Sequence, residues 1–269
     1  MLPTKYFHIF RISLIERLTY RSDFFLATFM RLLPMLTTIL LWSAVYQGSG
    51  KDDLSGFRLN EMIAYLLLVH ISRMFSSMPG LAGGIALDIR EGTLKKYLLQ
   101  PLDMLHYLVT YRMAHKIAYM TTSFIPYAAL FLLCRNYFTS FPDAATFGAY
   151  VLSLFMAFLV GFYFEACIGM VGFWLLEVTS LLYIVNTLNY FISGHMFPID
   201  LLPEELLVVL RVLPFQYMAY FPAAVFLGKI HGAALWQGLL AEAAWVVILF
   251  FLARLLYWIG LRRYSAYGG

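Results

Sequence analysis

Charge is scarce in this sequence, and the scarcity narrows the possible classes of protein. Only 13% of the 269 residues are charged, whereas 62% are hydrophobic and 18% are aromatic. Soluble domains are about half apolar and about a quarter charged. The composition, with a mean hydropathy of +0.76, therefore disfavours a soluble domain and predicts an integral membrane protein.

Cysteine is also rare, and the common catalytic and metal-binding patterns are missing. Cys134 and Cys167 lie in or beside apolar stretches and form no metal-binding pattern. The sequence has no H-E-x-x-H motif, and its histidines are scattered. We therefore expect no catalytic residues and no metal site, and a membrane enzyme is the weaker interpretation.

A nucleotide-binding loop is absent as well. Residues 48–53 read GSGKDD, but a P-loop needs G-x-x-x-x-G-K followed by Ser or Thr. Val45 stands in place of the first glycine, and Asp52, whose carboxylate would repel phosphate, follows Lys51. We expect a turn here and no cofactor in this chain.

Long apolar runs are what the sequence does contain. A helix needs about 20 apolar residues to cross a membrane. No linker or internal repeat divides the chain, so the prediction is one all-α membrane domain over residues 1–269. Its six predicted transmembrane helices are Phe24–Tyr46, Glu61–Gly83, Leu108–Cys134, Ala144–Leu176, Val178–Met196 and Ala234–Leu261.

The first 22 residues carry scattered charge and no apolar core of a signal peptide. Read as a helix, they place Phe7, Phe10, Leu14 and Leu18 on one face. This pattern predicts a helix along the membrane surface. The alternative is a plain N-terminal extension of the first span.

Basic residues cluster in alternate loops and predict the orientation in the membrane. Basic loops stay cytoplasmic, so both termini are expected in the cytoplasm. The net charge of +4 reflects this bias, and no basic domain suggests binding to nucleic acid. The residues that set the orientation are Lys5, Arg11, Arg17, Arg21, Arg90, Lys95, Lys96, Arg262 and Arg263.

Residues 88–103, DIREGTLKKYLLQPLD, form a charged stretch between the second and third predicted spans. Gly92 can end one helix, and Thr93 is a candidate N-cap for a short helix that begins at Leu94. Pro101 would end that helix, because it pushes the preceding residue away from helical geometry. Such a segment is either a solvated loop or a docking handle for another protein.

This stretch resembles the signature of bacterial ABC exporter permeases of the second class, the daunorubicin-exporter-like group, in which E-x-R-x-G-T is followed after a few residues by L-L-x-P-L. Asp88 stands where the pattern has glutamate. Four further segments resemble that family in the same order along the chain: GFWLLEVTS (172–180), GHMFPIDLLPEEL (194–206), PFQYMAYFPAAVFLGK (214–229) and LRRYSAYGG (261–269).

The resemblance implies six spans, an N-terminal interfacial helix (1–22), a cytoplasmic coupling region (84–106) and external re-entrant helices (197–232). It implies pairing with a second permease subunit and docking of an ABC ATPase that holds ATP and Mg²⁺. Leu94, Tyr97 and Leu98 are expected to pack into the ATPase. The full docking set that the motif implies is Asp88, Arg90, Glu91, Gly92, Thr93, Leu94, Tyr97, Leu98 and Pro101.

Prolines interrupt the apolar region before the last span, at positions 198, 203, 214 and 222. They prevent one long helix. We expect short helices that dip into the outer leaflet where protein covers their backbone. A simple external amphipathic loop is the alternative.

Polar residues inside the predicted spans need a reason, because a charge at mid-membrane costs about 2.5–3.5 kcal/mol. They could form an ion-pair network, for instance Arg73 with Glu165, or line a substrate path. Analogy with the family places the second and fifth spans near that path. The candidate residues for the substrate path, which could instead be packing residues, are His70, Arg73, Met74, Met78, Asn186, Asn189 and Tyr190.

The sequence thus predicts the membrane subunit of an ATP-driven exporter in a bacterial cytoplasmic membrane. The expected cargo is apolar or amphipathic, and the expected mechanism is alternating access. The alternative is a transporter driven by an ion gradient, with His70, Arg73 and Glu165 as a proton relay.

Overall fold

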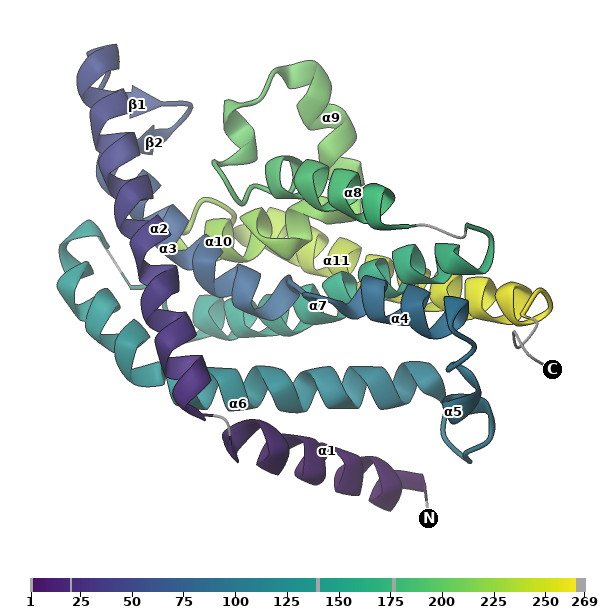
Figure 1. Cartoon of the computed structure of the whole chain (residues 1–269). Helices are drawn as coiled ribbons and strands as arrows, with labels where there is room; N and C mark the ends of the chain where they lie inside the picture. Colours follow the sequence, from purple (N-terminus) through teal and green to yellow (C-terminus); the bar gives the residue numbers. More distant parts are fainter. Residues whose placement is uncertain (1, 20, 139–140, 176–177, 265–269) are drawn as a thin grey trace. The chain divides into compact units, whose positions relative to one another are not determined.

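The computed structural model describes residues 2–19, 21–138, 141–175 and 178–264, most of which lie in helices (Figure 1). A small hairpin, β1 (Asp53–Leu54) with β2 (Phe57–Arg58), follows the second helix. The α-helices are α1 (Leu2–Thr19), α2 (Arg21–Ser49), α3 (Leu59–Ser76), α4 (Leu81–Arg90), α5 (Lys95–Leu98), α6 (Met104–Leu133), α7 (Ala144–Met170), α8 (Thr179–Ile192), α9 (Glu204–Val212), α10 (Tyr220–Phe226) and α11 (Gly232–Leu261). The 3-10 helices are η1 (Arg135–Tyr137), η2 (Val171–Phe173), η3 (Ile199–Leu201) and η4 (Pro214–Met218).

Four stretches of the described chain are long and apolar enough to cross a membrane: Leu59–Arg90, Met104–Leu133, Ala144–Phe173 and Gly232–Leu261. The predicted all-α membrane class is consistent with this architecture. The predicted fifth span is the 14-residue α8, about 21 Å long at 1.5 Å per residue. The hydrocarbon core is about 30 Å thick, so the six-span count stays a prediction.

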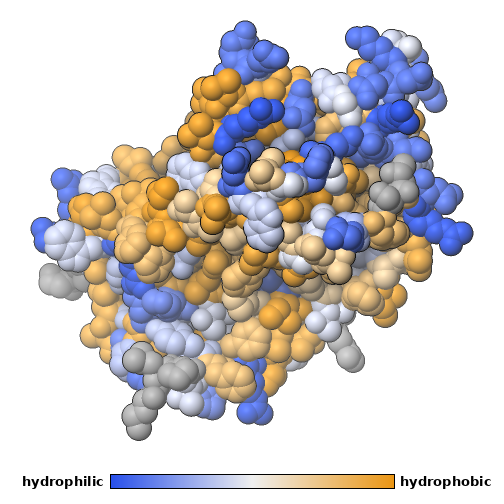
Figure 2. Space-filling model, turned by 180° about the vertical axis from the view of Figure 1, so that it is seen from behind, coloured by the Kyte–Doolittle hydropathy of each residue, from blue (hydrophilic) through white to orange (hydrophobic). Residues whose placement is uncertain are grey.

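Apolar side chains also cover much of the surface, as Figure 2 shows for the face seen from behind. A soluble protein rarely exposes large apolar areas, whereas a lipid-facing helix must. Exposed residues of this kind on α6 and α11 include Phe124, Ile125, Leu132, Leu133, Trp236, Leu240 and Phe251. These two helices therefore carry the lipid-facing character expected of spans.

The contacts divide the chain into two compact units. Unit 1 comprises residues 1–64 and 97–139, and unit 2 comprises residues 65–96 and 140–269. The chain passes from one unit to the other within α3 and again within α5. The short α5, which lies in the charged stretch, therefore contributes residues to both units.

In unit 1, α1 packs along α6, and α2 also contacts α6. The predicted N-terminal helix is confirmed over Leu2–Thr19. Phe10, Leu14 and Leu18 are partly buried, whereas Phe7 is exposed. The location of α1 on a membrane surface stays a prediction.

The predicted second span is not one continuous helix. It breaks between Ser76, where α3 ends, and Leu81, where α4 begins. Pro79 disfavours helical geometry at the residue before it, and Gly80 has φ +73°, which glycine adopts without strain. A broken helix at membrane depth is tolerated only where protein covers it or where it lines a cavity.

Helix α7 is the centre of unit 2 and contacts α4, α10, α11 and η4. Two of its glycines let other backbones approach closely. A Cβ atom on Gly161 would stand 2.0 Å from the Ser76 carbonyl oxygen, and one on Gly169 would stand 2.7 Å from the Ala82 carbonyl oxygen. Small residues commonly permit such helix contacts in membranes, and here they hold the broken helix against α7.

The region before the last span forms four short helices, η3, α9, η4 and α10, as the prolines predict. All seven residues of α10 are buried in the protein. Protein therefore covers this backbone, as a re-entrant segment would require. Its depth in the outer leaflet stays a prediction.

Candidate functional site

The charged stretch folds into a compact turn in unit 2. Helix α4 ends at Arg90, and Gly92 then takes φ +70°, which reverses the chain. The Leu94 amide donates a hydrogen bond to the Asp88 carbonyl oxygen at 2.9 Å. This bond closes the turn and brings Thr93 back to the last turn of α4.

The Asp88 side chain stabilises this turn. Its Oδ1 accepts a hydrogen bond from the Thr93 hydroxyl at 2.7 Å and forms an ion pair with the Lys96 ammonium group at 2.8 Å. The N-cap prediction for Thr93 was therefore wrong in detail. The short helix begins at Lys95 rather than at Leu94, and the Thr93 hydroxyl bonds backward to Asp88.

The predicted docking residues differ in their exposure. Leu94 has 0% exposure, so it is an interior residue and offers no surface to a partner. Leu98 is 46% exposed and Leu99 is 83% exposed. Leu94 is therefore covered by this chain itself, and its packing into an ATPase stays a prediction. Of the remaining docking candidates, Arg90, Glu91 and Pro101 are exposed, whereas Gly92 is buried.

The second half of the segment belongs to unit 1, where aromatic contacts link it to α6 and α1. The Tyr97 and Tyr107 rings have centroids 5.5 Å apart, and Tyr107 stacks on Tyr111 at 6.4 Å. The Arg17 guanidinium of α1 donates a hydrogen bond to the Tyr111 hydroxyl and lies 5.6 Å from that ring. A displacement of Tyr97 would therefore alter the packing of Tyr107 and Tyr111 on α6 and of Arg17 on α1.

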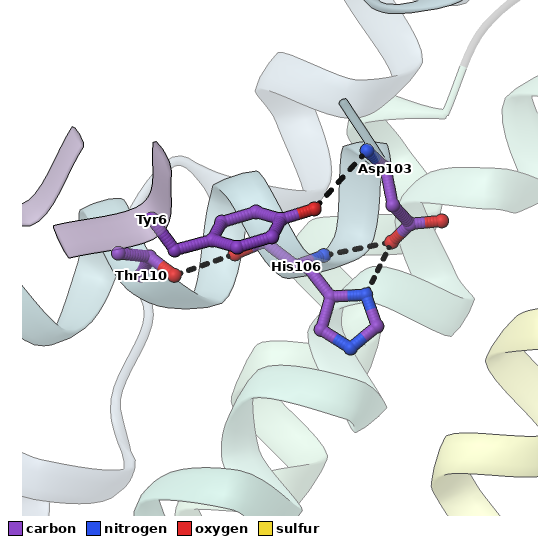
Figure 3. A network of polar contacts seen from close by, with 4 residues as sticks. All are labelled: Tyr6, Asp103, His106 and Thr110. Atoms are coloured by element: carbon purple, nitrogen blue, oxygen red, sulfur yellow. Dashed lines mark hydrogen bonds and ion pairs between the residues drawn. The ribbon is translucent and has the colours of Figure 1, made fainter. Parts of the chain in front are cut away.

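A second connection to α1 lies at the start of α6 (Figure 3). Asp103 caps this helix, because its side chain accepts hydrogen bonds from the His106 amide and from His106 Nδ1, each at 2.9 Å. The Asp103 amide donates to the Tyr6 hydroxyl at 3.4 Å, and the Thr110 hydroxyl donates to the His106 carbonyl at 2.7 Å. The cap follows a simple sequence signal, Asp before an apolar run, whereas the Tyr6 contact has none.

A cavity of about 320 Å³ with a mixed apolar and polar lining lies in unit 2 beside the break between α3 and α4; it is called the polar cavity below, after the charged and polar side chains that line it. Its size is at the lower end for small-molecule sites. The end of α3, the break, α4, α7, α8, the turn after α8 and η4 all contribute to its wall. The lining residues are Arg73, Ser76, Ser77, Met78, Pro79, Gly80, Ala82, Gly83, Gly161, Phe164, Glu165, Leu182, Asn186, Asn189, Tyr190, His195 and Met218.

Stacked side chains organise one part of the cavity wall. The Arg73 guanidinium lies 5.1 Å from the centre of the Tyr190 ring, and the His195 ring stacks on Tyr190 at 5.8 Å. The Tyr65 hydroxyl donates to the Gly194 carbonyl at 2.6 Å and thereby fixes the turn that carries His195. An acid, Glu165, lines the same cavity as Arg73.

The structure brings together five of the seven predicted path residues. Arg73, Met78, Asn186, Asn189 and Tyr190 all line the polar cavity, whereas His70 and Met74 are not among its lining residues. Their role as a substrate path stays a prediction.

Ser76 and His195 were not singled out from the sequence, and Glu165 was considered for an ion pair or a proton relay rather than listed among the path candidates; all three line the same cavity. Glu165 had a usable signal as a charge within an apolar stretch. His195 had none, because its position depends on how the turn after α8 folds back.

The family comparison agrees with this architecture. A sequence model of the family described as "ABC-2 family transporter protein" matches residues 32–268. No curated protein matches the chain significantly. Members of this family form the membrane component of ABC transporters and associate in general with ABC ATPases. The match covers most of the chain and includes the Asp88 turn and the polar cavity, so the chain belongs to the ABC-2 family of transporter permeases.

Proposed function

We propose that this permease is the membrane-spanning subunit of an ATP-driven exporter in the bacterial cytoplasmic membrane. It pairs with a second permease subunit, identical or related, and both termini face the cytoplasm. An ABC ATPase docks on residues 88–101 and holds the ATP and Mg²⁺. ATP binding closes the ATPase pair, and the permeases change from an inward-facing to an outward-facing state. The cargo is apolar or amphipathic.

The observation that supports docking most strongly is the combination of a fixed turn with an exposed apolar end. Asp88, Thr93 and Lys96 hold the turn together in unit 2, and Leu98 and Leu99, which follow it in the sequence, are exposed. Apolar anchors in such contacts supply affinity, while rim charges such as Arg90 and Glu91 set specificity.

The arrangement also supports a route for movement. Within unit 1, Tyr97 contacts Tyr107, which stacks on Tyr111, and Arg17 of α1 contacts Tyr111. Packed side chains of this kind carry displacement from one element to the next. An ATPase that moves α5 would therefore also shift α6 and α1.

Leu98→Asp tests the docking surface. A carboxylate on the exposed apolar end should prevent burial in the ATPase, so association should fall at least about tenfold, which corresponds to about 1.4 kcal/mol. The chain should still insert into membranes. Leu206→Asp is the matched control, because Leu206 is exposed on α9, outside the coupling segment. Unchanged association of Leu98→Asp in a pull-down with the co-expressed ATPase would contradict the proposal.

A transport assay in proteoliposomes separates the proposal from its alternative. Export should require ATP and the partner ATPase. Transport that proceeds without nucleotide and follows a proton gradient would instead favour the ion-driven transporter with His70, Arg73 and Glu165.

A further inference from the structure

Three buried polar atoms on residues of the polar cavity have no hydrogen-bond partner within the described chain. They are the Ser76 hydroxyl oxygen, Asn189 Oδ1 and His195 Nε2. Ser76 is 3% exposed. Leaving such an atom unsatisfied costs about 1–3 kcal/mol. All three atoms belong to residues that line one cavity, so a ligand that reaches them with hydrogen-bond donors would stabilise the site.

The surrounding hydrogen bonds define what two of these atoms offer. The Ser193 hydroxyl donates its only proton to the main-chain carbonyl oxygen of Asn189. The proton in the Ser193–His195 hydrogen bond must therefore come from His195 Nδ1. Neutral His195 therefore presents Nε2 as an acceptor. The Asn189 amide nitrogen donates to Met218 sulfur at 3.5 Å, which leaves Oδ1 as a second acceptor.

The two acceptors require a ligand rich in hydrogen-bond donors. A primary ammonium group carries three N–H donors and no acceptor, and the acid Glu165, which lines the same cavity, is a counter-charge for it when ionised. A quaternary ammonium group has the same charge but no N–H donor, so it would leave His195 Nε2 and Asn189 Oδ1 unsatisfied.

The charges of the wall also suggest an anionic group on the ligand. Arg73 lies over the Tyr190 ring and lines the same cavity as Glu165. A wall with one fixed cation and one acid complements a ligand that carries both signs. A volume of about 320 Å³ accommodates a head group and excludes the greater part of a large amphipath.

We propose that the polar cavity binds the zwitterionic head group of an amphipathic molecule, through a primary ammonium group and an adjoining anionic group such as a phosphodiester. Asn189 Oδ1, His195 Nε2 and Glu165 receive the ammonium group, and Arg73 receives the anionic group. The proposal rests on the proposed export function only in identifying the class of molecule that this permease handles.

The test compares two head groups that differ only in N-methylation. The full-length chain is placed in nanodiscs of choline-headgroup lipid and titrated with dihexanoyl phosphatidylethanolamine or dihexanoyl phosphatidylcholine. Thermal unfolding and hydrogen exchange over residues 73–83 are measured. We expect the ethanolamine compound to raise the unfolding midpoint and slow exchange at the break, with at least about tenfold tighter half-saturation than the choline compound. Equal effects of the two compounds would overturn the proposal.

Variants tie the preference to the cavity. Asn189→Leu and His195→Phe should each abolish the preference for the ethanolamine compound, whereas His231→Phe, an exposed histidine outside the cavity, should leave it unchanged. Asn189→Asp keeps an acceptor and adds negative charge, so ethanolamine binding should tighten about fivefold, because charge-assisted hydrogen bonds are about twice as strong. If Asn189→Leu does not fold, weaker binding by Asn189→Asp still contradicts the proposal.

The head group can come from a bilayer lipid or from an exported amphipath, and the nanodisc titration gives a different result for each source. If a bilayer lipid occupies the cavity, nanodiscs of ethanolamine lipid should stabilise the chain by themselves, and the soluble compound should add nothing. If an exported amphipath occupies it, the soluble compound should act in both kinds of nanodisc. The proposed function is tested separately. If the wild type shows no head-group preference but the ATPase still docks, only this inference is rejected. If the preference is present but the ATPase does not dock, only the proposed function is rejected.

Discussion

The main-chain carbonyl oxygen of Ser76 stands 2.0 Å from the position that a Cβ atom on Gly161 would occupy. Ser76 is the last residue of α3, and Gly161 lies in α7. The break in the predicted second span therefore packs directly against the backbone of α7. The polar cavity, which both residues line, depends on this contact.

Gly161→Ala should disrupt this contact. The added methyl group would collide with main-chain atoms, and overpacking of this kind costs about 1–3 kcal/mol. We expect a lower unfolding midpoint and loss of ethanolamine-headgroup binding. Gly148→Ala in the same helix is the matched control, because a Cβ atom there meets nothing within 4 Å, and it should stabilise the helix by about 0.5–1 kcal/mol. Equal stability of the two variants would mean that the contact is not tight.

The Asp88–Thr93 bond should control how well the coupling segment is ordered. Thr93→Val keeps the shape of the side chain and removes the hydroxyl that donates to Asp88 at 2.7 Å, which should cost about 1 kcal/mol locally. Amide exchange over residues 92–98 should accelerate, and ATPase association should weaken about fivefold. Thr93→Ser retains the donor and should behave like the wild type. Identical exchange in the Val and Ser variants would show that the hydroxyl does not order the turn.

The Ser153–Glu242 bond joins α7 to α11 inside unit 2. The Ser153 hydroxyl donates to Glu242 Oε2 at 2.8 Å, and Glu242 is 0% exposed. Ser153→Ala leaves a buried carboxyl group without this donor, so the unfolding free energy should fall by about 1–3 kcal/mol. Glu242→Gln still accepts from Ser153 and should be much closer to the wild type. Denaturant titration in detergent distinguishes them, and a Ser153→Ala variant as stable as wild type would refute the role of this bond.

Asp143 gives the permease a pH-dependent helix cap outside the predicted spans. It precedes α7, and hydrogen bonding from the Thr146 side chain, with the main-chain N–H groups of Thr146 and Ala145, lowers the pKa of its carboxyl group. A lowered pKa contributes stability above the unfolded value of about 3.9, and this contribution is lost as pH falls through the folded value. Asparagine, which does not titrate, would cap the helix at every pH.

The measurement compares unfolding midpoints of wild type and Asp143→Asn at several pH values. The wild type should lose stability relative to the variant as pH falls below about 4. A difference that stays constant down to about pH 2 would show that the cap does not titrate in this way.

The sequence predicted several parts of this permease well, because they depend on local chemistry. Apolar runs predicted the long helices, the prolines predicted the short helices before α11, and the family pattern marked residues 88–101. The break at Pro79 and Gly80 had a local signal as well, but the continuous hydropathy of the stretch outweighed it.

Tertiary packing, in contrast, determines which distant residues meet. Periodicity places Asn189 and Tyr190 on a helix face, but it does not say that α3 ends against α7 or that His195 folds back to stack on Tyr190. Leu94 illustrates the same limit: its sequence position suggested an outward apolar strip, whereas the Asp88 turn buries it. Composition and local propensity determine helices and turns; packing between segments far apart in the chain determines the cavity and the accessible part of the coupling segment.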